Sequence, residues 1–236
     1  MEQIELRGVT LSFGKGRGRV VAVTNINLAV PKGGFLSITG PSGSGKSALL
    51  RLIAGMEKPT AGTVWLNGRD PWRLRFLKRR RFCRETIAQV PRSLEVRRYR
   101  TTIDAVAATA PRALDKEAKR AHAVDMLDRV GLGNRLTHQP FTLSGGERRR
   151  LALARALGAG RPIVLAEEPT GQVDPSTAQG LLALMRDINA ASHTTFVIVT
   201  DDESLAREAT RSIRLEEGRV VYDHSRTFTP VIQRTR

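Results

Sequence analysis

The chain has 236 residues, one cysteine, four histidines and a formal net charge of +16. A single cysteine excludes an internal disulfide and any cysteine-based metal site, and His122, His138, His193 and His224 lack metal-ligand spacing. The apolar runs are much shorter than the ~20 residues of a membrane-spanning helix, and the N-terminus has no apolar signal region. We therefore expect a soluble protein that stays in the cytoplasm.

Strand patterns fill the first 30 residues. Residues Ile4–Val9 alternate between apolar and polar side chains, and Val20–Val30 contains two further β-runs around Asn25. A turn at Pro31–Gly34 separates these runs from the short apolar segment Phe35–Thr39. The pattern predicts an antiparallel β layer at the N-terminus.

A glycine-rich loop follows Phe35–Thr39 and precedes the helix-like run Ala48–Ala54. It reads G-P-S-G-S-G-K-S and fits G-x-x-x-x-G-K-S/T, in which backbone amides cradle phosphates, the lysine reaches the β- and γ-phosphates and the hydroxyl binds Mg²⁺. The helix start adds a favourable site for anions. We expect ATP and Mg²⁺ as ligands. The expected phosphate-binding residues are Gly40, Pro41, Ser42, Gly43, Ser44, Gly45, Lys46, Ser47 and Ala48, with Ser47 also binding the metal.

A strongly basic segment follows the strand-like Gly62–Leu66 and the Asn67-Gly68 turn. Between Arg69 and Arg100 there are twelve basic and three acidic side chains. This excess predicts a surface that faces phosphate, either anionic lipid headgroups beside a membrane partner or a nucleic-acid backbone. A merely solvated face has equal weight as an explanation.

Helices and strands alternate in the second half of the chain. Residues 86–136 favour a helical subdomain, and from Glu147 onward the order is helix, strand, helix, strand, helix and a hairpin at Glu217-Gly218. Such alternation is typical of an α/β fold with a mainly parallel sheet. We expect one domain over residues 1–224 and a basic tail over residues 225–236.

Residues Leu143–Glu147 read L-S-G-G-E and precede the helix-like run Arg148–Leu157. Ser144 and the amides of Gly145 and Gly146 offer hydrogen bonds and a helix N-terminus to a phosphate. With the glycine-rich loop, this signature makes almost the whole chain resemble the ATP-binding subunits of ABC transporters. The resemblance is strongest to the branch of macrolide and lipoprotein exporters and the cell-division ABC ATPase.

The resemblance implies a P-loop NTPase fold and two subunits that close head to tail over two ATP molecules. Each pocket would combine the P-loop of one subunit with Ser144, Gly145, Gly146 and Glu147 of the other, and would drive a separate permease at the inner face of the membrane. Phe13 matches the aromatic residue that stacks on adenine, with a plain core role as the alternative. Gln89 matches the glutamine that senses Mg²⁺ and the attacking water, with an ordinary surface role as the alternative.

Three carboxylates follow the later strands at positions of known importance in the family. Glu168 matches the general base, Glu167 replaces the usual aspartate that organises Mg²⁺, and Asp201 replaces the switch histidine. An ionised Asp201 would repel a γ-phosphate by ~4 kcal/mol at ~4 Å with an effective dielectric of 20. We therefore expect slow turnover and pairing with a different ATPase subunit, with a weakly active homodimer as the alternative. Asp174 matches a loop that crosses the dimer interface, although a helix N-cap also attracts carboxylates.

Two rival functions remain open at this point. A nucleic-acid-associated ATPase of the same superfamily would explain the basic segment, but such relatives carry two ATPase halves or long inserts, for which 236 residues leave no room. We expect no nucleic-acid partner. A scaffold that binds ATP without hydrolysing it would explain the changes at Glu167 and Asp201.

Overall fold

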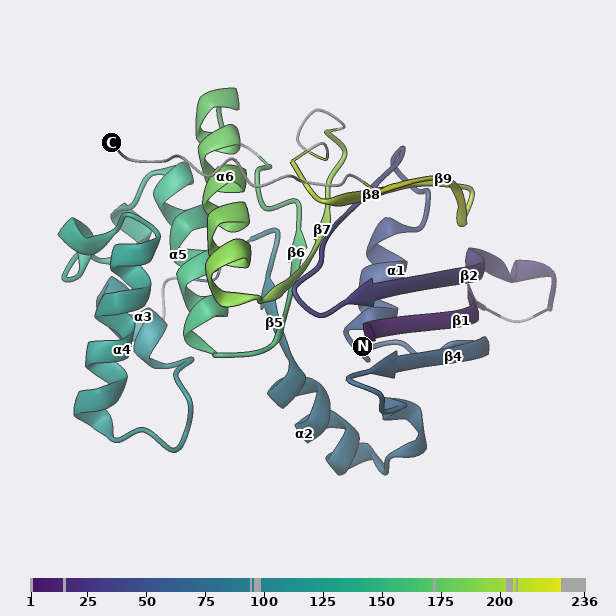
Figure 1. Cartoon of the computed structure of the whole chain (residues 1–236), viewed down its shortest axis with the longest axis horizontal. Coiled ribbons are helices and arrows are strands. Elements are labelled where there is room, and N and C mark those ends of the chain that lie inside the picture. The colour runs from purple at the N-terminus through teal and green to yellow at the C-terminus, as the bar shows by residue number, and fades with distance from the viewer. Residues whose placement is uncertain are drawn as a thin grey trace, which may run out of the picture.

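Two β-sheets and a group of helices build the chain (Figure 1). The computed structural model describes residues 2–14, 16–93, 95, 99–171, 173–202, 206 and 208–225. The three-stranded sheet consists, in spatial order, of β2 (Val20–Pro31), β1 (Glu2–Phe13) and β4 (Ala61–Leu66). The six-stranded sheet consists of β5 (Ile87–Val90), β6 (Ile163–Glu167), β7 (Thr195–Val199), β3 (Phe35–Thr39), β8 (Arg211–Glu216) and β9 (Arg219–Ser225). The α-helices are α1 (Lys46–Ile53), α2 (Phe76–Thr86), α3 (Thr102–Ala107), α4 (Lys116–Arg129), α5 (Gly145–Gly158) and α6 (Pro175–Ser192).

Strand directions agree with the sequence. The pairs β5–β6, β6–β7, β7–β3 and β3–β8 are parallel, whereas β8–β9 and the whole three-stranded sheet are antiparallel. The predicted α/β class, with an N-terminal antiparallel layer and a P-loop NTPase arrangement, is confirmed. The hairpin at Glu217-Gly218 joins β8 to β9, and β9 ends at Ser225. The rest of the expected tail, residues 226–236, lies outside the described residues.

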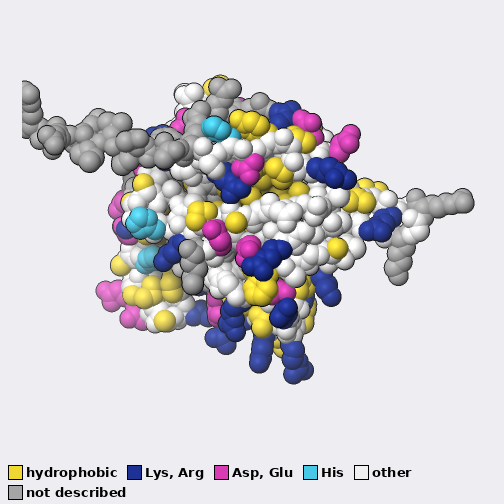
Figure 2. Space-filling model, turned by 45° about the vertical axis from the view of Figure 1, so that its right-hand side comes forward, with side chains coloured by type: hydrophobic (Ala, Val, Ile, Leu, Met, Phe, Trp, Pro, Cys, Tyr) yellow, Lys and Arg dark blue, Asp and Glu magenta, His cyan; other side chains and the backbone are white. Residues whose placement is uncertain are grey.

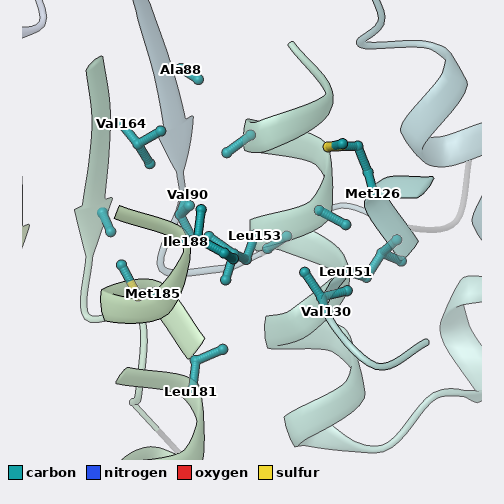
Figure 3. Packing of buried hydrophobic residues seen from close by; sticks show 14 of the residues in the cluster. Ala88, Val90, Met126, Val130, Leu151, Leu153, Val164, Leu181, Met185 and Ile188 are labelled. Atoms are coloured by element: carbon teal, nitrogen blue, oxygen red, sulfur yellow. The ribbon is translucent and has the colours of Figure 1, made fainter. Parts of the chain in front are cut away.

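The six-stranded sheet separates the core into two clusters. Side chains alternate between the two faces of a strand, so Leu36 and Ile38 of β3 join α1 and the three-stranded sheet, whereas Phe35 points to the other face. There Val164 of β6 packs with Leu153 of α5 and other apolar side chains of α4 and α6 (Figure 3). Helices α1 and α5 consequently cover opposite faces of one sheet (Figure 1).

One strand replaces the two β-runs that Val20–Val30 predicts. Strand β2 continues through Asn25, which adopts a left-handed conformation with φ of 50°. The amide of Asn25 donates to Thr10 Oγ1 at 3.0 Å, and the register with β1 shifts on either side of Val9. Asn25 therefore sits in a β-bulge rather than in a turn, because asparagine tolerates this backbone conformation.

The helical region begins later than the sequence suggests. Residues Ile87–Val90 form β5 at one edge of the main sheet, because Ile87 packs into one core cluster while Ala88 and Val90 pack into the other. Helices α3 and α4 follow, and α5, beyond the expected end at residue 136, packs against both. Within the described ranges, none of the helices is long and apolar enough to cross a bilayer.

Candidate functional site

The loop between β3 and α1 is wedged against distant parts of the chain. Gly40 has φ of +139°, and a Cβ there would lie 2.1 Å from the carbonyl oxygen of Leu215. Gly45 has φ of +102°, and a Cβ there would lie 2.2 Å from the carbonyl oxygen of Ala22. Only glycine fits such backbone approaches. Strand β2 and the β8–β9 hairpin thus fix the shape of this glycine-rich loop, residues 40–48, which we call the P-loop.

Lys46 is held at the first turn of α1 and is only 7% exposed. Its Nζ donates to the carbonyl oxygens of Gly40 at 2.7 Å and Pro41 at 2.9 Å. The same nitrogen lies 2.7 Å from Oδ1 of Asp201. Because an ammonium group has three N–H donors, these three acceptors can occupy all of them.

The P-loop has the properties of a phosphate cradle. Ser44 Oγ is buried without a hydrogen-bond partner among the described residues. Around Gly43, with φ of +81°, an added Cβ would meet no atom within 4 Å. An orphaned hydroxyl, an open loop and a helix N-terminus together suit an anion such as a nucleotide phosphate.

Ser47 and Glu167 meet across 120 residues of sequence. The Ser47 hydroxyl donates to Oε1 of Glu167 at 2.6 Å, where β6 ends beside the start of α1. Both groups are hard oxygen ligands of the kind that Mg²⁺ prefers. The part of the chain that the structure describes contains no cluster of three or more His, Cys, Asp or Glu that could hold a metal alone. A magnesium ion here would therefore need phosphate and water oxygens as well.

Glu168 and Asp201 lie at the ends of neighbouring parallel strands. Glu168 follows β6 with φ of 45°, and its amide donates to the carbonyl of Val199 at 2.9 Å. Burial raises the pKa of the Glu168 carboxyl, and the nearby charge of Asp201 raises it further. A raised pKa makes a carboxylate a stronger base, as a group that accepts a proton from water requires.

Gln89 and Phe13 belong to two different strands, and Gln89 shares a cavity with a residue of the site. Gln89 of β5 is exposed, and it lines a cavity of about 90 Å³ together with Met56, Leu165 and Glu167. This common cavity is consistent with a sensing role. Phe13 ends β1 and is 43% exposed, so the plain core alternative does not fit it. Its ring is accessible for stacking.

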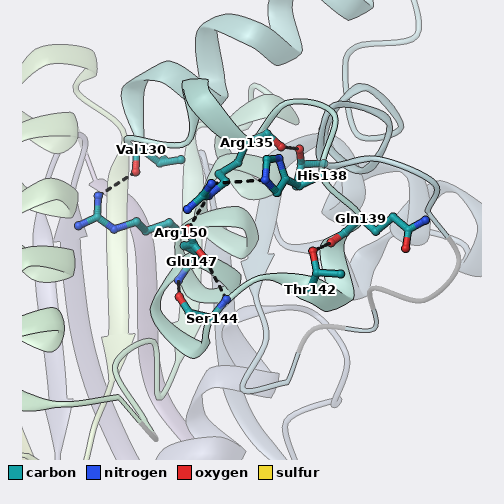
Figure 4. Close-up of polar contacts among 9 residues, drawn as sticks. Val130, Arg135, His138, Gln139, Thr142, Ser144, Glu147 and Arg150 are labelled. Atoms are coloured by element: carbon teal, nitrogen blue, oxygen red, sulfur yellow. Dashed lines mark hydrogen bonds and ion pairs between the residues drawn. The ribbon is translucent and has the colours of Figure 1, made fainter.

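The signature residues form the N-terminus of α5. Ser144 Oγ accepts from the amide of Glu147 at 3.2 Å, and Oε2 of Glu147 accepts from the amide of Ser144 at 2.9 Å (Figure 4). This reciprocal pair is a capping box. Arg135 donates to the other carboxylate oxygen at 2.8 Å, and its hydrogen bond, with those of Ser144, lowers the pKa of Glu147 to about 2. Glu147 thus fixes the helix start, which leaves the amides of Gly145 and Gly146 as candidate phosphate donors.

Asp174 is an N-cap. Its carboxylate accepts from the amide of Thr177 at 2.9 Å and from the hydroxyls of Ser176 and Thr177, each at 2.6 Å, at the start of α6. The hydrogen bond from Ser176 is the largest cause that lowers the pKa of Asp174. The helix-cap alternative for this residue is therefore correct, and it does not conflict with a position at a subunit interface.

Arg149 is a connecting residue that the sequence analysis missed. From α5 its Nη2 donates to the carbonyl of Gly171 at 2.8 Å, and its Nη1 donates to the carbonyl of Arg92. Arg149 thereby joins the signature helix to the loop after Glu168 and to the loop after β5. The run of three arginines after the signature was the available signal. Such runs usually form solvated faces. Here all three arginines donate to backbone carbonyls instead, because Arg148 donates to Leu143 and Arg150 donates to Val130.

The predicted site residues therefore form two groups. Lys46, Ser47, Glu167, Glu168 and Asp201 gather where β3, β6 and β7 end, the usual place of ligand binding in a parallel sheet. The Ser144–Glu147 signature lies at the start of α5, the helix that covers the sheet face opposite to α1 (Figure 1). None of the hydrogen bonds or ion pairs of the described residues joins the two groups.

Comparisons with known proteins give the family. The ABC transporter family model matches residues 23–171. The lipoprotein-releasing system ATP-binding protein LolD of Pseudomonas syringae pv. tomato is 39% identical over 221 residues, 92% of this chain and 96% of LolD. The macrolide export ATP-binding/permease protein MacB of Bordetella avium is 38% identical over 232 residues, 96% of this chain but only 35% of MacB. The chain thus spans about a third of that relative.

A solved structure agrees with these matches. The dimeric post-hydrolysis state of the ATP-binding cassette MJ0796, bound to ADP and Pi, superposes with a TM-score of 0.85 at 32% identity. The alignment covers 95% of this chain and all of that one. The resemblance to macrolide and lipoprotein exporters is confirmed. The chain belongs to the ATP-binding proteins of the ABC transporter family.

Proposed function

We propose that this chain is the ATP-hydrolysing subunit of a transporter or mechanotransmission complex whose membrane permease is a separate protein. The observation that carries this proposal is the separation of the P-loop group, at the ends of β3, β6 and β7, from the signature at the start of α5, because α1 and α5 cover opposite faces of the sheet. Neither group encloses a nucleotide by itself, so each suits completion by a second subunit. ATP would close such a dimer and hydrolysis would reopen it, at the cytoplasmic face of the membrane.

The residues of the P-loop group have distinct roles in this proposal. Lys46 and the loop amides bind the phosphates. Ser47 and Glu167 would hold Mg²⁺, which supplies charge neutralisation when bound, and Gln89 adjoins Glu167. Glu168 orients the attacking water and accepts its proton, and burial helps because it raises the basicity of the carboxylate. Phe13 stacks on the adenine.

Calorimetry with ATP and Mg²⁺ tests the proposal. The wild-type chain should bind both ATP and ADP, and Lys46→Ala should weaken ATP binding by at least tenfold. Arg129→Ala is a matched control, because Arg129 lies on α4 and pairs with Asp125 at 3.1 Å on the surface. Absence of any nucleotide binding by the folded wild-type chain would refute the function.

We further propose that turnover at this P-loop is slow and that the partner subunit is a different ATPase. Glu167 is one methylene longer than the aspartate of the family, and Asp201 puts a negative charge where the family has histidine. A partner with a complete P-loop site would then use the Ser144–Glu147 signature of this chain. Brisk, cooperative hydrolysis by the purified chain alone would contradict this pairing.

A basic face around α2 suits the membrane side of the complex. Arg75, Lys78, Arg80, Arg81 and Arg84 are exposed on or beside α2, and Lys and Arg side chains protrude together from this part of the molecule (Figure 2). Aromatic rings order part of this face, since Arg79 lies 4.1 Å from the ring centroid of Trp72. Arg97 and Arg98 of the same segment lie outside the described residues.

Beside this basic face lies a cavity of about 600 Å³, lined by Met56, Phe76, Cys83, Gln89 and three arginines. We propose that a permease segment occupies the cavity while the arginines around it contact anionic lipid. Vesicles with phosphatidylserine should bind the chain more tightly than neutral vesicles, and Arg80→Gln should weaken that binding about fivefold. Arg129→Gln on α4 is the control. Equal binding to both vesicle types would exclude the lipid contact, and co-purification would identify the permease.

A further inference from the structure

The carboxylate of Asp201 binds the side-chain ammonium group of Lys46. Lys46 Nζ already has two carbonyl acceptors, and the Asp201 carboxylate at 2.7 Å supplies the third. A phosphate oxygen that reaches Nζ must therefore displace one of these acceptors. Nucleotide binding at this P-loop is thus an exchange of acceptors rather than the filling of a vacant one.

Of the three acceptors, Asp201 is the one that can leave. The carbonyls of Gly40 and Pro41 belong to the loop that β2 and the β8–β9 hairpin hold in place. The Asp201 side chain is 64% exposed and follows β7 in a bend, so it can rotate into water without disturbing the core. As an anion it also resembles a phosphate oxygen in charge and acceptor chemistry.

We propose that Asp201 determines nucleotide specificity by competing with the γ-phosphate for Lys46. The inference rests on the proposed role of Lys46 in phosphate binding and deepens it. Lys46 reaches both the β- and the γ-phosphate of ATP but only the β-phosphate of ADP, so ADP competes with Asp201 less strongly than ATP does. ATP must displace Asp201 and leave its charge close by. The site therefore binds ADP more tightly, relative to ATP, than it would without this carboxylate.

Calorimetry with a non-hydrolysable ATP analogue and with ADP, both with Mg²⁺, measures the effect directly. Asp201→Asn should tighten binding of the analogue about two- to fivefold, from the size of one partly exposed ion pair, and should change the ADP affinity by a smaller factor. Asp201→Ser should behave in the same way. Asp202→Asn is the matched control, since it removes the same charge one residue further along and should leave the ratio of the two affinities unchanged.

A double-mutant cycle tests the contact itself. Lys46→Met, Asp201→Asn and the double variant are compared by urea unfolding without nucleotide. If the losses in the free energy of unfolding of the two single variants do not add up to that of the double variant, the result supports the ion pair. Additive losses would overturn it.

The outcomes separate this inference from the proposed function. A wild-type chain that binds neither nucleotide refutes the function and the inference together. A chain that binds both nucleotides, with the same affinity ratio in wild type and in Asp201→Asn, overturns the role of Asp201 alone. An equal change of that ratio in Asp202→Asn also overturns it, because the effect would then be general electrostatics.

Discussion

The P-loop and the signature of this chain both place a helix N-terminus where a phosphate can bind, but they are built in different ways. The P-loop depends on backbone that is remote in sequence, since Gly40 abuts Leu215 and Gly45 abuts Ala22. The signature depends on its own neighbours, because Ser144 and Glu147 cap each other across three residues. Changes at the first site should therefore disturb the whole fold, whereas changes at the second should remain local.

The largest expected effect comes from Glu168, beside the P-loop, because its substitution should remove a chemical step rather than change stability. Glu168→Gln should reduce ATP turnover by roughly 10²- to 10⁴-fold, because an amide cannot accept the proton of the attacking water, and should prolong the ATP-bound dimer. Phosphate release measures the first effect and size-exclusion chromatography the second. Glu217→Gln is the matched control, since Glu217 has a similar φ of 47° against 45° for Glu168. Equal turnover in Glu168→Gln and wild type would make the chain a scaffold.

Two glycines of the P-loop test whether contacts with remote backbone determine the shape of the loop. Gly40→Ala should lower the free energy of unfolding by about 3 kcal/mol, because the new Cβ would clash with Leu215 in addition to the strain of a positive φ. Gly43→Ala adds a Cβ with no atom within 4 Å, so it should cost only about 1 kcal/mol of strain. Urea denaturation without nucleotide compares the two. Similar losses would show that remote packing does not shape the loop.

On the signature side, Ser144→Ala removes one cap. It should lower the free energy of unfolding by about 1 kcal/mol and also reduce ATP-dependent dimerisation. Asp115→Ala removes the comparable cap of α4, where Asp115 accepts from the amide of Ala118 at 2.8 Å. It should cost a similar amount of stability without affecting dimerisation. Dimer loss in both variants would assign the effect to helix stability in general.

The smallest expected effect is an acid sensitivity of the signature. The folded pKa of Glu147, about 2, lies below its ordinary value of 4.5, so its ion pair stabilises the fold fully above about pH 4.5. That contribution is lost as the pH falls from 4.5 toward 2. Arg135→Gln should flatten the pH dependence of urea unfolding in this window, by less than about 1 kcal/mol. Arg129→Gln, which breaks an exposed pair with Asp125 at 3.1 Å, should not. An unchanged slope in Arg135→Gln would contradict the assignment.

The sequence predicted the features that depend on neighbouring residues, but not those that depend on residues remote in sequence. The strand, loop and helix around Lys46, the helix start at Ser144 and the hairpin at Glu217-Gly218 are local patterns, and the structure contains each of them. The contact of Lys46 with Asp201 is not local. The two residues are far apart in sequence and meet only because β3 and β7 pair in register. The sequence suggested that Asp201 repels phosphate, but it could not show that Asp201 already binds the lysine.

Packing also decided the remaining differences. Ile87–Val90 joined the main sheet because its side chains fill both core clusters, which a helical pattern in the following residues obscured. Asn25 lies in a bulge of β2, so the strand continues through it instead of ending there. In the sequence, Arg149 is one of three consecutive arginines, a pattern typical of a solvated helix face. Only the packing of α5 places it where it can donate to two loop carbonyls.

The six-stranded sheet lies between helix α1, which begins with Lys46, and helix α5, which begins with Gly145. For subunits that complete each other's pockets, the reaction then becomes second order in protein when the solution is dilute, and a membrane that confines both subunits to one plane raises the rate simply by concentrating them.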